Sequence, residues 1–91
     1  MTFAQSQKKI LTSLSTAGWQ VSSNLKIPHA TDPSGRFRFY FKPRSIHLDI
    51  GPGFALTNAR SLWCDTKAVA SLEDAAIAPR LLDVAQDYSR I

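Results

Sequence analysis

Two neighbouring segments of the chain, residues 36–42 and 46–50, alternate strictly between apolar and polar residues. Successive side chains of a β-strand point to opposite faces of a sheet, so this alternation predicts two half-buried strands. The apolar positions are Phe37, Phe39, Phe41, Ile46, Leu48 and Ile50, and the polar positions are Arg36, Arg38, Tyr40, Lys42, His47 and Asp49. The pattern therefore predicts a sheet with an apolar back and a basic, aromatic-bearing front.

The four residues 42–45 between these segments predict the register of a hairpin. Pro43 suits the second position of a type I turn better than a two-residue turn whose first central residue needs a positive φ. Such a loop gives the pairs Phe41–Ile46, Phe39–Leu48 and Phe37–Ile50 on the buried side, and Tyr40–His47 and Arg38–Asp49 on the other. We expect Asp49 to have Arg38 as its partner across the strands.

The N-terminal segment has the spacing of a helix that begins at Phe3 and ends at Ala17. Thr2 and Gln5 form a capping box, and Gly18 suits the left-handed position that follows a helix. The apolar stripe consists of Phe3, Ile10, Leu14 and Ala17, widened by Leu11. We expect Trp19, directly after the glycine, to be a core residue.

From Trp19 the apolar period becomes two, which predicts a first strand over 19–27 that weakens toward Asn24 and ends at Pro28. Residues 29–35 have turn chemistry, with Asp32 and Pro33 opening the turn and Gly35 closing it. We expect this segment to connect the first strand to the second. It would place His29 in a loop, where functional residues are frequent.

The C-terminal half carries weaker signals. Residues 51–53 form a turn, and Phe54 and Leu56 indicate a short fourth strand. Residues 58–66 are open to two interpretations, namely a short helix capped by Asn58 that contains Leu62 and Trp63, or an edge strand in which Leu62 and Cys64 alternate.

Ser71 and Asp74 form a second capping box and predict that a helix begins near Leu72. Pro79 predicts a kink or a break, with a helix restarting at that residue. The stripe of the last helix would be Leu81, Leu82, Ala85 and Tyr88.

These elements predict one α+β domain over residues 1–91. We expect two layers, in which an antiparallel sheet of three to four strands is covered on its Phe37, Phe39 and Phe41 face by the N- and C-terminal helices. A chain of 91 residues has room for one core and little surface for a buried catalytic cleft, so a non-enzymatic role is favoured.

The net charge of +4 is distributed unevenly. Up to Cys64 there are eight basic residues and two acids, a balance of +6, whereas the remainder has three bases and five acids, a balance of −2. This asymmetry fits an anionic partner for one face, and equally a basic sheet beside an acidic helix.

Other chemistry is sparse. The single Cys64 excludes an internal disulfide, and no Cys-x-x-Cys or His-x-x-x-His pair indicates a metal site, so we expect no metal and no cofactor. Neither a signal peptide nor a membrane-spanning stretch is evident, and we expect a cytoplasmic protein.

The strongest candidate site is the basic front, where Arg36, Arg38, Lys42 and Arg44 would contact phosphates and Tyr40 would stack on a base. The favoured interpretation is a small binding module for nucleic acid. A protein-binding accessory or inhibitor of a mobile genetic element, phage or plasmid, stays open, with a partner whose surface is acidic.

The order of predicted elements over residues 7–42 is also similar to that of a known family. A helix, Gly18-Trp19, a strand, the loop histidine His29, the turn Asp32-Pro33-Ser34-Gly35-Arg36 and a further strand follow one another. This order is similar to the HicA-type mRNA interferase toxins, which are small, basic, double-stranded-RNA-binding-like domains. The resemblance implies a toxin-like ribonuclease that uses His29. The chain has Ile27-Pro28 where that family has Gly-Ser or Gly-Thr, and its second half departs from the pattern.

Overall fold

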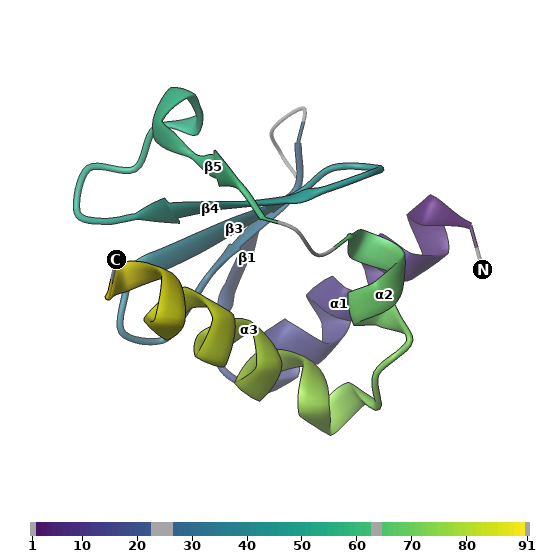
Figure 1. Cartoon of the computed structure of the whole chain (residues 1–91). Helices are drawn as coiled ribbons and strands as arrows, with labels where there is room; N and C mark the ends of the chain where they lie inside the picture. Colours follow the sequence, from purple (N-terminus) through teal and green to yellow (C-terminus); the bar gives the residue numbers. More distant parts are fainter. Residues whose placement is uncertain (1, 23–26, 63–64, 91) are drawn as a thin grey trace.

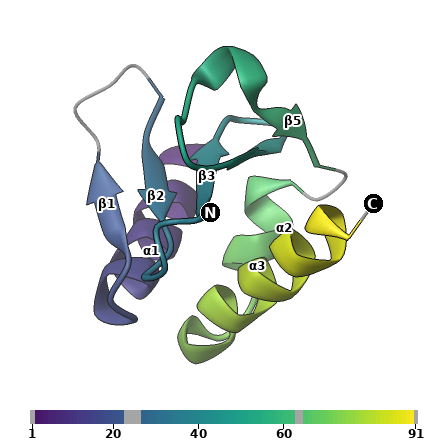
Figure 2. The same ribbon diagram turned by 90° about the vertical axis from the view of Figure 1, so that its left-hand side faces the viewer.

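The computed structural model describes residues 2–22, 27–62 and 65–90. Its helices are α1 (Phe3–Thr16), α2 (Thr66–Ala70), α3 (Asp74–Ser89) and the 3-10 helix η1 (Leu56–Asn58), and its strands are β1 (Gln20–Ser22), β2 (His29–Thr31), β3 (Phe37–Phe41), β4 (Ile46–Ile50) and β5 (Arg60–Ser61). The strands form an antiparallel sheet in the order β1-β2-β3-β4-β5. The three α-helices lie on one side of it (Figures 1 and 2). The predicted α+β class is confirmed, with five strands in place of three or four.

The β3–β4 hairpin has the predicted register at all five pairs, from Phe37 opposite Ile50 to Phe41 opposite Ile46. The four-residue loop is also confirmed, because the Lys42 amide donates to the Ser45 carbonyl over 3.0 Å. One detail is wrong. Ile50, the last residue of β4, is 40% exposed and not buried as predicted.

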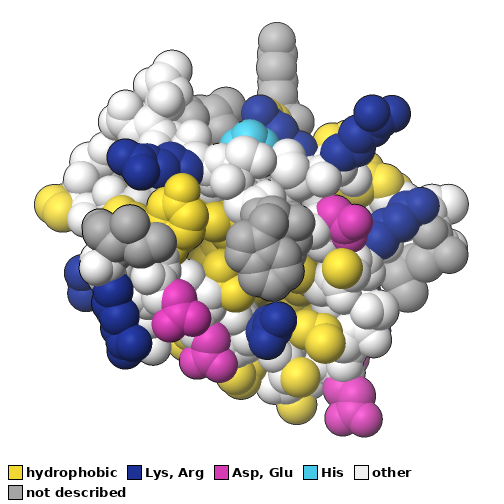
Figure 3. Space-filling view, in the orientation of Figure 1, with side chains coloured by type: hydrophobic (Ala, Val, Ile, Leu, Met, Phe, Trp, Pro, Cys, Tyr) yellow, Lys and Arg dark blue, Asp and Glu magenta, His cyan; other side chains and the backbone are white. Residues whose placement is uncertain are grey.

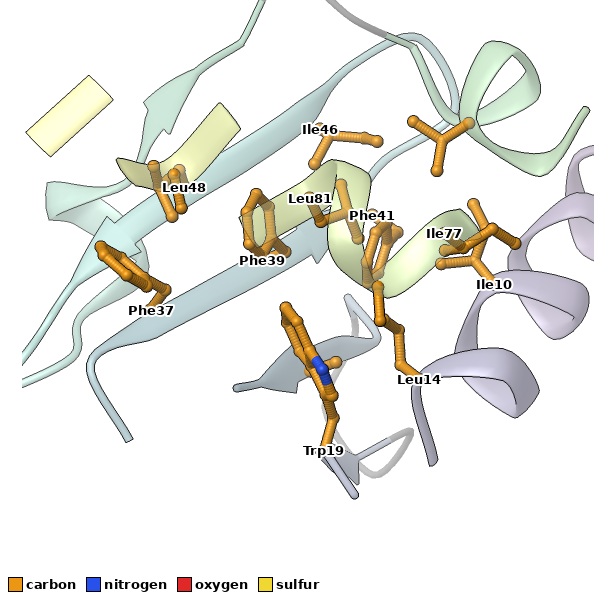
Figure 4. Close-up of a cluster of buried hydrophobic side chains, with 14 of the residues drawn as sticks. Ile10, Leu14, Trp19, Phe37, Phe39, Phe41, Ile46, Leu48, Ile77 and Leu81 are labelled. Atoms are coloured by element: carbon orange, nitrogen blue, oxygen red, sulfur yellow. The ribbon is translucent and has the colours of Figure 1, made fainter. Parts of the chain in front are cut away.

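The core lies between the sheet and the helices. Phe37, Phe39 and Phe41 of β3, with Leu48 and Ile46 of β4, point toward α1 and α3 (Figure 4). The helices contribute the fully buried side chains Ile10, Leu14, Ile77 and Leu81. Trp19 is buried as predicted, and its ring centroid is 5.9 Å from that of Phe39.

Helix α1 has the predicted ends. The Gln5 amide donates to the Thr2 hydroxyl over 3.1 Å, and the Thr2 amide donates to the Gln5 side-chain oxygen over 2.8 Å. Gly18 follows with a φ of 91°. Lys9 ties α1 to the end of α2, because its Nζ donates to the carbonyls of Ala70 and Leu72 over 2.6 and 2.8 Å.

The predicted loop 29–35 is partly wrong. His29–Thr31 is a strand, β2, whose three residues are all buried between β1 and β3. The turn itself is shorter and lies at Asp32–Gly35, where the Gly35 amide donates to the Asp32 carbonyl over 2.9 Å. The predicted first strand is observed at Gln20–Ser22, and residues 23–26 lie outside the described residues.

The C-terminal half differs more from prediction. Leu56–Asn58 is a 3-10 helix in place of a strand. An edge strand is present, but it is β5, Arg60–Ser61, and ends before Leu62. Trp63 and Cys64, on which the two interpretations partly depend, lie outside the described residues.

The predicted second capping box is wrong. Ser71 is the C-cap of α2, a helix that begins after Asp65, and α3 begins after Glu73. Pro79 lies inside an uninterrupted α3, so the predicted break is wrong as well. Proline in a helix interior costs about 3 kcal/mol. Burial of Ile77, Leu81 and Ala85 along the same helix offsets this cost.

Replacing Phe39 with alanine should lower the free energy of unfolding by about 3–5 kcal/mol, because a fully buried ring is lost and a cavity remains. Ile50→Ala, on the same hairpin but 40% exposed, is the matched control and should lose only a fraction of this. Urea denaturation measures both. Equal losses in the two variants would contradict the assigned core.

Candidate functional site

The sheet face opposite the helices, here called the polar face, carries the predicted site. Residues that pair across antiparallel strands lie on the same side of a sheet. The register therefore builds two rows, of which one is Gln20, Thr31, Arg38 and Asp49 and the other is Ser22, His29, Tyr40, His47 and Ser61.

The four predicted cations are spread along β3 and the turn that follows it. Arg36 and Arg44 are exposed, whereas Arg38 and Lys42 are half-buried. A strand rises about 3.3 Å per residue, so Arg36 and Lys42 are separated by roughly 20 Å along it. The cations thus form a line and do not converge on one point.

Two aromatic rings hold the arginines at the first end of this line. The guanidinium carbon of Arg36 lies 5.2 Å from the Phe37 ring centroid. That of Arg38 lies 4.3 Å from the centroid of Phe54, and its Nε donates to the Thr31 hydroxyl over 2.9 Å. These contacts orient the guanidinium groups without neutralising their charge.

Tyr40 does not have the predicted role. Its side chain is only 4% exposed, and its ring centroid lies 5.4 Å from that of His29. A buried ring presents no free surface on which a nucleic-acid base could stack. The prediction of an exposed aromatic platform is wrong, because Tyr40 is buried beside the His29 ring.

The predicted pairing of the Arg38 and Asp49 side chains is also wrong, although the two residues are opposite each other. Asp49 is 4% exposed, and its Oδ2 accepts the Ala55 amide over 2.6 Å. Arg38 turns instead to Thr31 and Phe54. The β4–β5 connection, which carries Phe54 and Ala55, therefore supplies the partner of each group.

Asp32, the other acid of the first 64 residues, is equally engaged. Its carboxylate accepts the Ser34 hydroxyl over 2.6 Å and the amides of Phe37, Ser34 and Arg36 over 2.9 to 3.2 Å. Burial disfavours the charged form, but these hydrogen bonds outweigh it and lower the pKa of Asp32. The same bonds fix the backbone at Arg36, where the line of cations begins.

The polar face therefore has cations that no acid of the described residues neutralises. Among the described residues, Arg36, Arg38, Lys42 and Arg44 have no ion pair, and the observed pairs, Lys9–Asp74 at 3.7 Å and Arg90–Asp87 at 3.9 Å, belong to the helices. In Figure 3, Asp and Glu lie mainly in the lower half, where Figure 1 places the helices.

The two histidines flank Tyr40 in the same row. Burial and then the charge of Arg38 lower the pKa of His29, while burial and then Lys42 lower the pKa of His47. His47 Nε2 lies 2.8 Å from the Ser45 hydroxyl, a contact that the sequence analysis missed. Its only signal in the sequence is the spacing Ser45-x-His47 at the start of a strand.

His29 lines a hollow in the polar face. The hollow has a volume of about 380 Å³ and is lined by Gln20, Val21, Ser22, His29, Thr31 and Arg38. The histidine reaches it from a buried strand, not from the loop that the HicA resemblance requires.

The helical side has a larger and more apolar groove between α1 and α3. It has a volume of about 840 Å³ and includes Trp19, Ala78 and Leu82. No cluster of three or more His, Cys, Asp or Glu side chains suited to a metal ion occurs in the part of the chain that the structure describes. None of the helices described is both long and apolar enough to cross a membrane.

Comparison with protein families, with curated proteins and with solved structures gives no match to this chain. The resemblance to HicA-type toxins thus gains no support from these comparisons.

The lowered pKa of Asp32 predicts a specific pH dependence of stability. The stabilisation is present above the unfolded-state pKa of 3.8 and is lost as the pH falls through the lower folded-state value. Asp32→Asn should therefore be less stable than the wild type at neutral pH and approach it in strong acid. Denaturation at a series of pH values measures the difference. Asp83→Asn, at an exposed site on α3, is the control, and parallel curves for wild type and Asp32→Asn would refute the assignment.

Proposed function

We propose that the chain binds nucleic acid through the phosphate backbone, using the polar face of the sheet and the β3–β4 turn. The observation that carries the proposal is the separation of charge on this face. Both acids of the first 64 residues are buried and hydrogen-bonded to backbone amides, whereas the four cations have no ion pair among the described residues.

The length of the cationic line supports a polymer as the ligand. Arg36 and Lys42 are roughly 20 Å apart along β3, a distance too great for one small anion to neutralise both. Each strand of a DNA duplex carries a phosphate about every 3.4 Å along the helix axis. A backbone lying along β3 would therefore offer several phosphates to the four side chains.

The burial of Tyr40 supports backbone contacts over base recognition. Sequence is read through hydrogen bonds and apolar contacts to base edges, or by stacking on exposed rings. The predicted stacking residue is covered, and the exposed groups of the site are cations at its two ends. We therefore expect binding with little dependence on sequence.

The salt dependence of binding to a mixed-sequence DNA duplex tests the proposal. Three to four phosphate contacts predict a slope of about −3 to −4 in a plot of log affinity against log salt, because each contact releases counterions. Lys42→Ala and Arg44→Ala should each weaken binding and flatten the slope by about 1. Fluorescence anisotropy with a labelled duplex measures both quantities.

Arg80→Ala is the matched control, since it removes one exposed positive charge from α3 in the helical layer. It should leave the slope unchanged. Equal weakening by Arg80→Ala and Lys42→Ala would show that net charge alone attracts the duplex. Absence of binding at low salt would reject the proposal and favour a protein partner with an acidic surface.

A further inference from the structure

The hollow beside His29 has the chemistry of an anion site. Its lining comes from three adjacent strands and contains the polar side chains of Gln20, Ser22, His29, Thr31 and Arg38, together with Val21. None of the described residues that line it carries a carboxylate, so an anion that enters meets donors and a fixed positive charge. The volume of about 380 Å³ is sufficient for a phosphate group with accompanying water.

Two of the residues that line the hollow, His29 and Arg38, have polar atoms without a hydrogen-bond partner among the described residues, and the Arg38 guanidinium also lies over the Phe54 ring. His29 is 6% exposed, and its Nδ1 is buried with no hydrogen-bond partner among the described residues. Arg38 uses Nε on Thr31, but its terminal nitrogens have no partner in the described chain. A buried polar atom without a partner is costly, and a phosphate oxygen would satisfy it.

We propose that this hollow is a phosphate subsite of the polar face, in which Arg38 and the protonated form of His29 hold one phosphodiester group of the bound nucleic acid. The proposal rests on the proposed function and adds the position of one contact. It also makes binding proton-linked, because His29 takes up a proton when the phosphate enters.

The surroundings of His29 explain why nucleic-acid affinity should rise as the pH falls. On β3 it faces Arg38 and the ring of Tyr40, and on β1 it faces Ser22. A hydrogen bond with the Ile27 backbone favours the charged ring and raises the pKa of His29, but burial and Arg38 outweigh it. Burial and Arg38 lower the pKa of His29 in the free protein, so the imidazole is neutral at neutral pH. A phosphate beside Arg38 offsets the positive charge and favours the imidazolium, so affinity rises as the pH falls.

The test is the binding of a labelled DNA duplex of about 20 base pairs at about pH 6 and about pH 8, at constant ionic strength. The complex should be several-fold tighter at the lower pH, because His29 takes up a proton on binding and protons are more available there. His29→Gln should lose most of this dependence. His47→Gln should lose less of it, because His47 lies outside the hollow and contacts Ser45, although Lys42, a proposed phosphate contact, also lowers the pKa of His47.

A second measurement does not depend on any variant folding. Proton NMR titration of the His29 ring in the wild-type chain should give a higher pKa with the duplex than without it. Salt-dependent binding that is independent of pH would overturn this inference and leave the proposed function intact. Equal pH dependence in wild type and folded His29→Gln would also overturn it. Absence of binding at both pH values would overturn the two proposals together.

Discussion

The packing of one face of the β3–β4 hairpin against α1 and α3 is the interaction on which the rest of the structure depends. Phe39, Phe41 and Leu48 are almost completely buried against helix residues such as Leu14 and Leu81. Because side chains alternate along a strand, this contact decides on which face of the sheet each remaining side chain of the hairpin lies. A slip by one residue would bury Arg38 and expose Phe39, at a cost that the fold could not sustain.

The same constraint produces the distribution of charge. With the phenylalanines committed to the core, Arg36, Arg38 and Lys42 must face the other side. The two nearby acids do not neutralise them, since Asp32 closes the β2–β3 turn and Asp49 accepts the amide of Ala55. The carboxylates are used in building the turns, and the cations remain available for a polyanion.

The sequence predicts the elements whose signals are local and strong. The ends of α1 follow from Thr2, Gln5 and Gly18, and the hairpin register follows from alternation with a turn that suits Pro43. β2 is not predicted, because its three residues are all buried and its sequence therefore shows no alternation of apolar and polar residues. Tertiary burial also accounts for the helix that continues through Pro79 and for the covered ring of Tyr40.

Mapping the bound surface by backbone amide NMR, with a mixed-sequence DNA duplex added to the labelled protein at low salt, tests the central claim most directly. The account predicts that shifts concentrate in β2, β3 and the turn at 42–45, where the cations of the polar face lie. Amides in the middle of α3, on the opposite side of the sheet, should not change. Shifts confined to the groove between α1 and α3, or no shifts at all, would contradict the account.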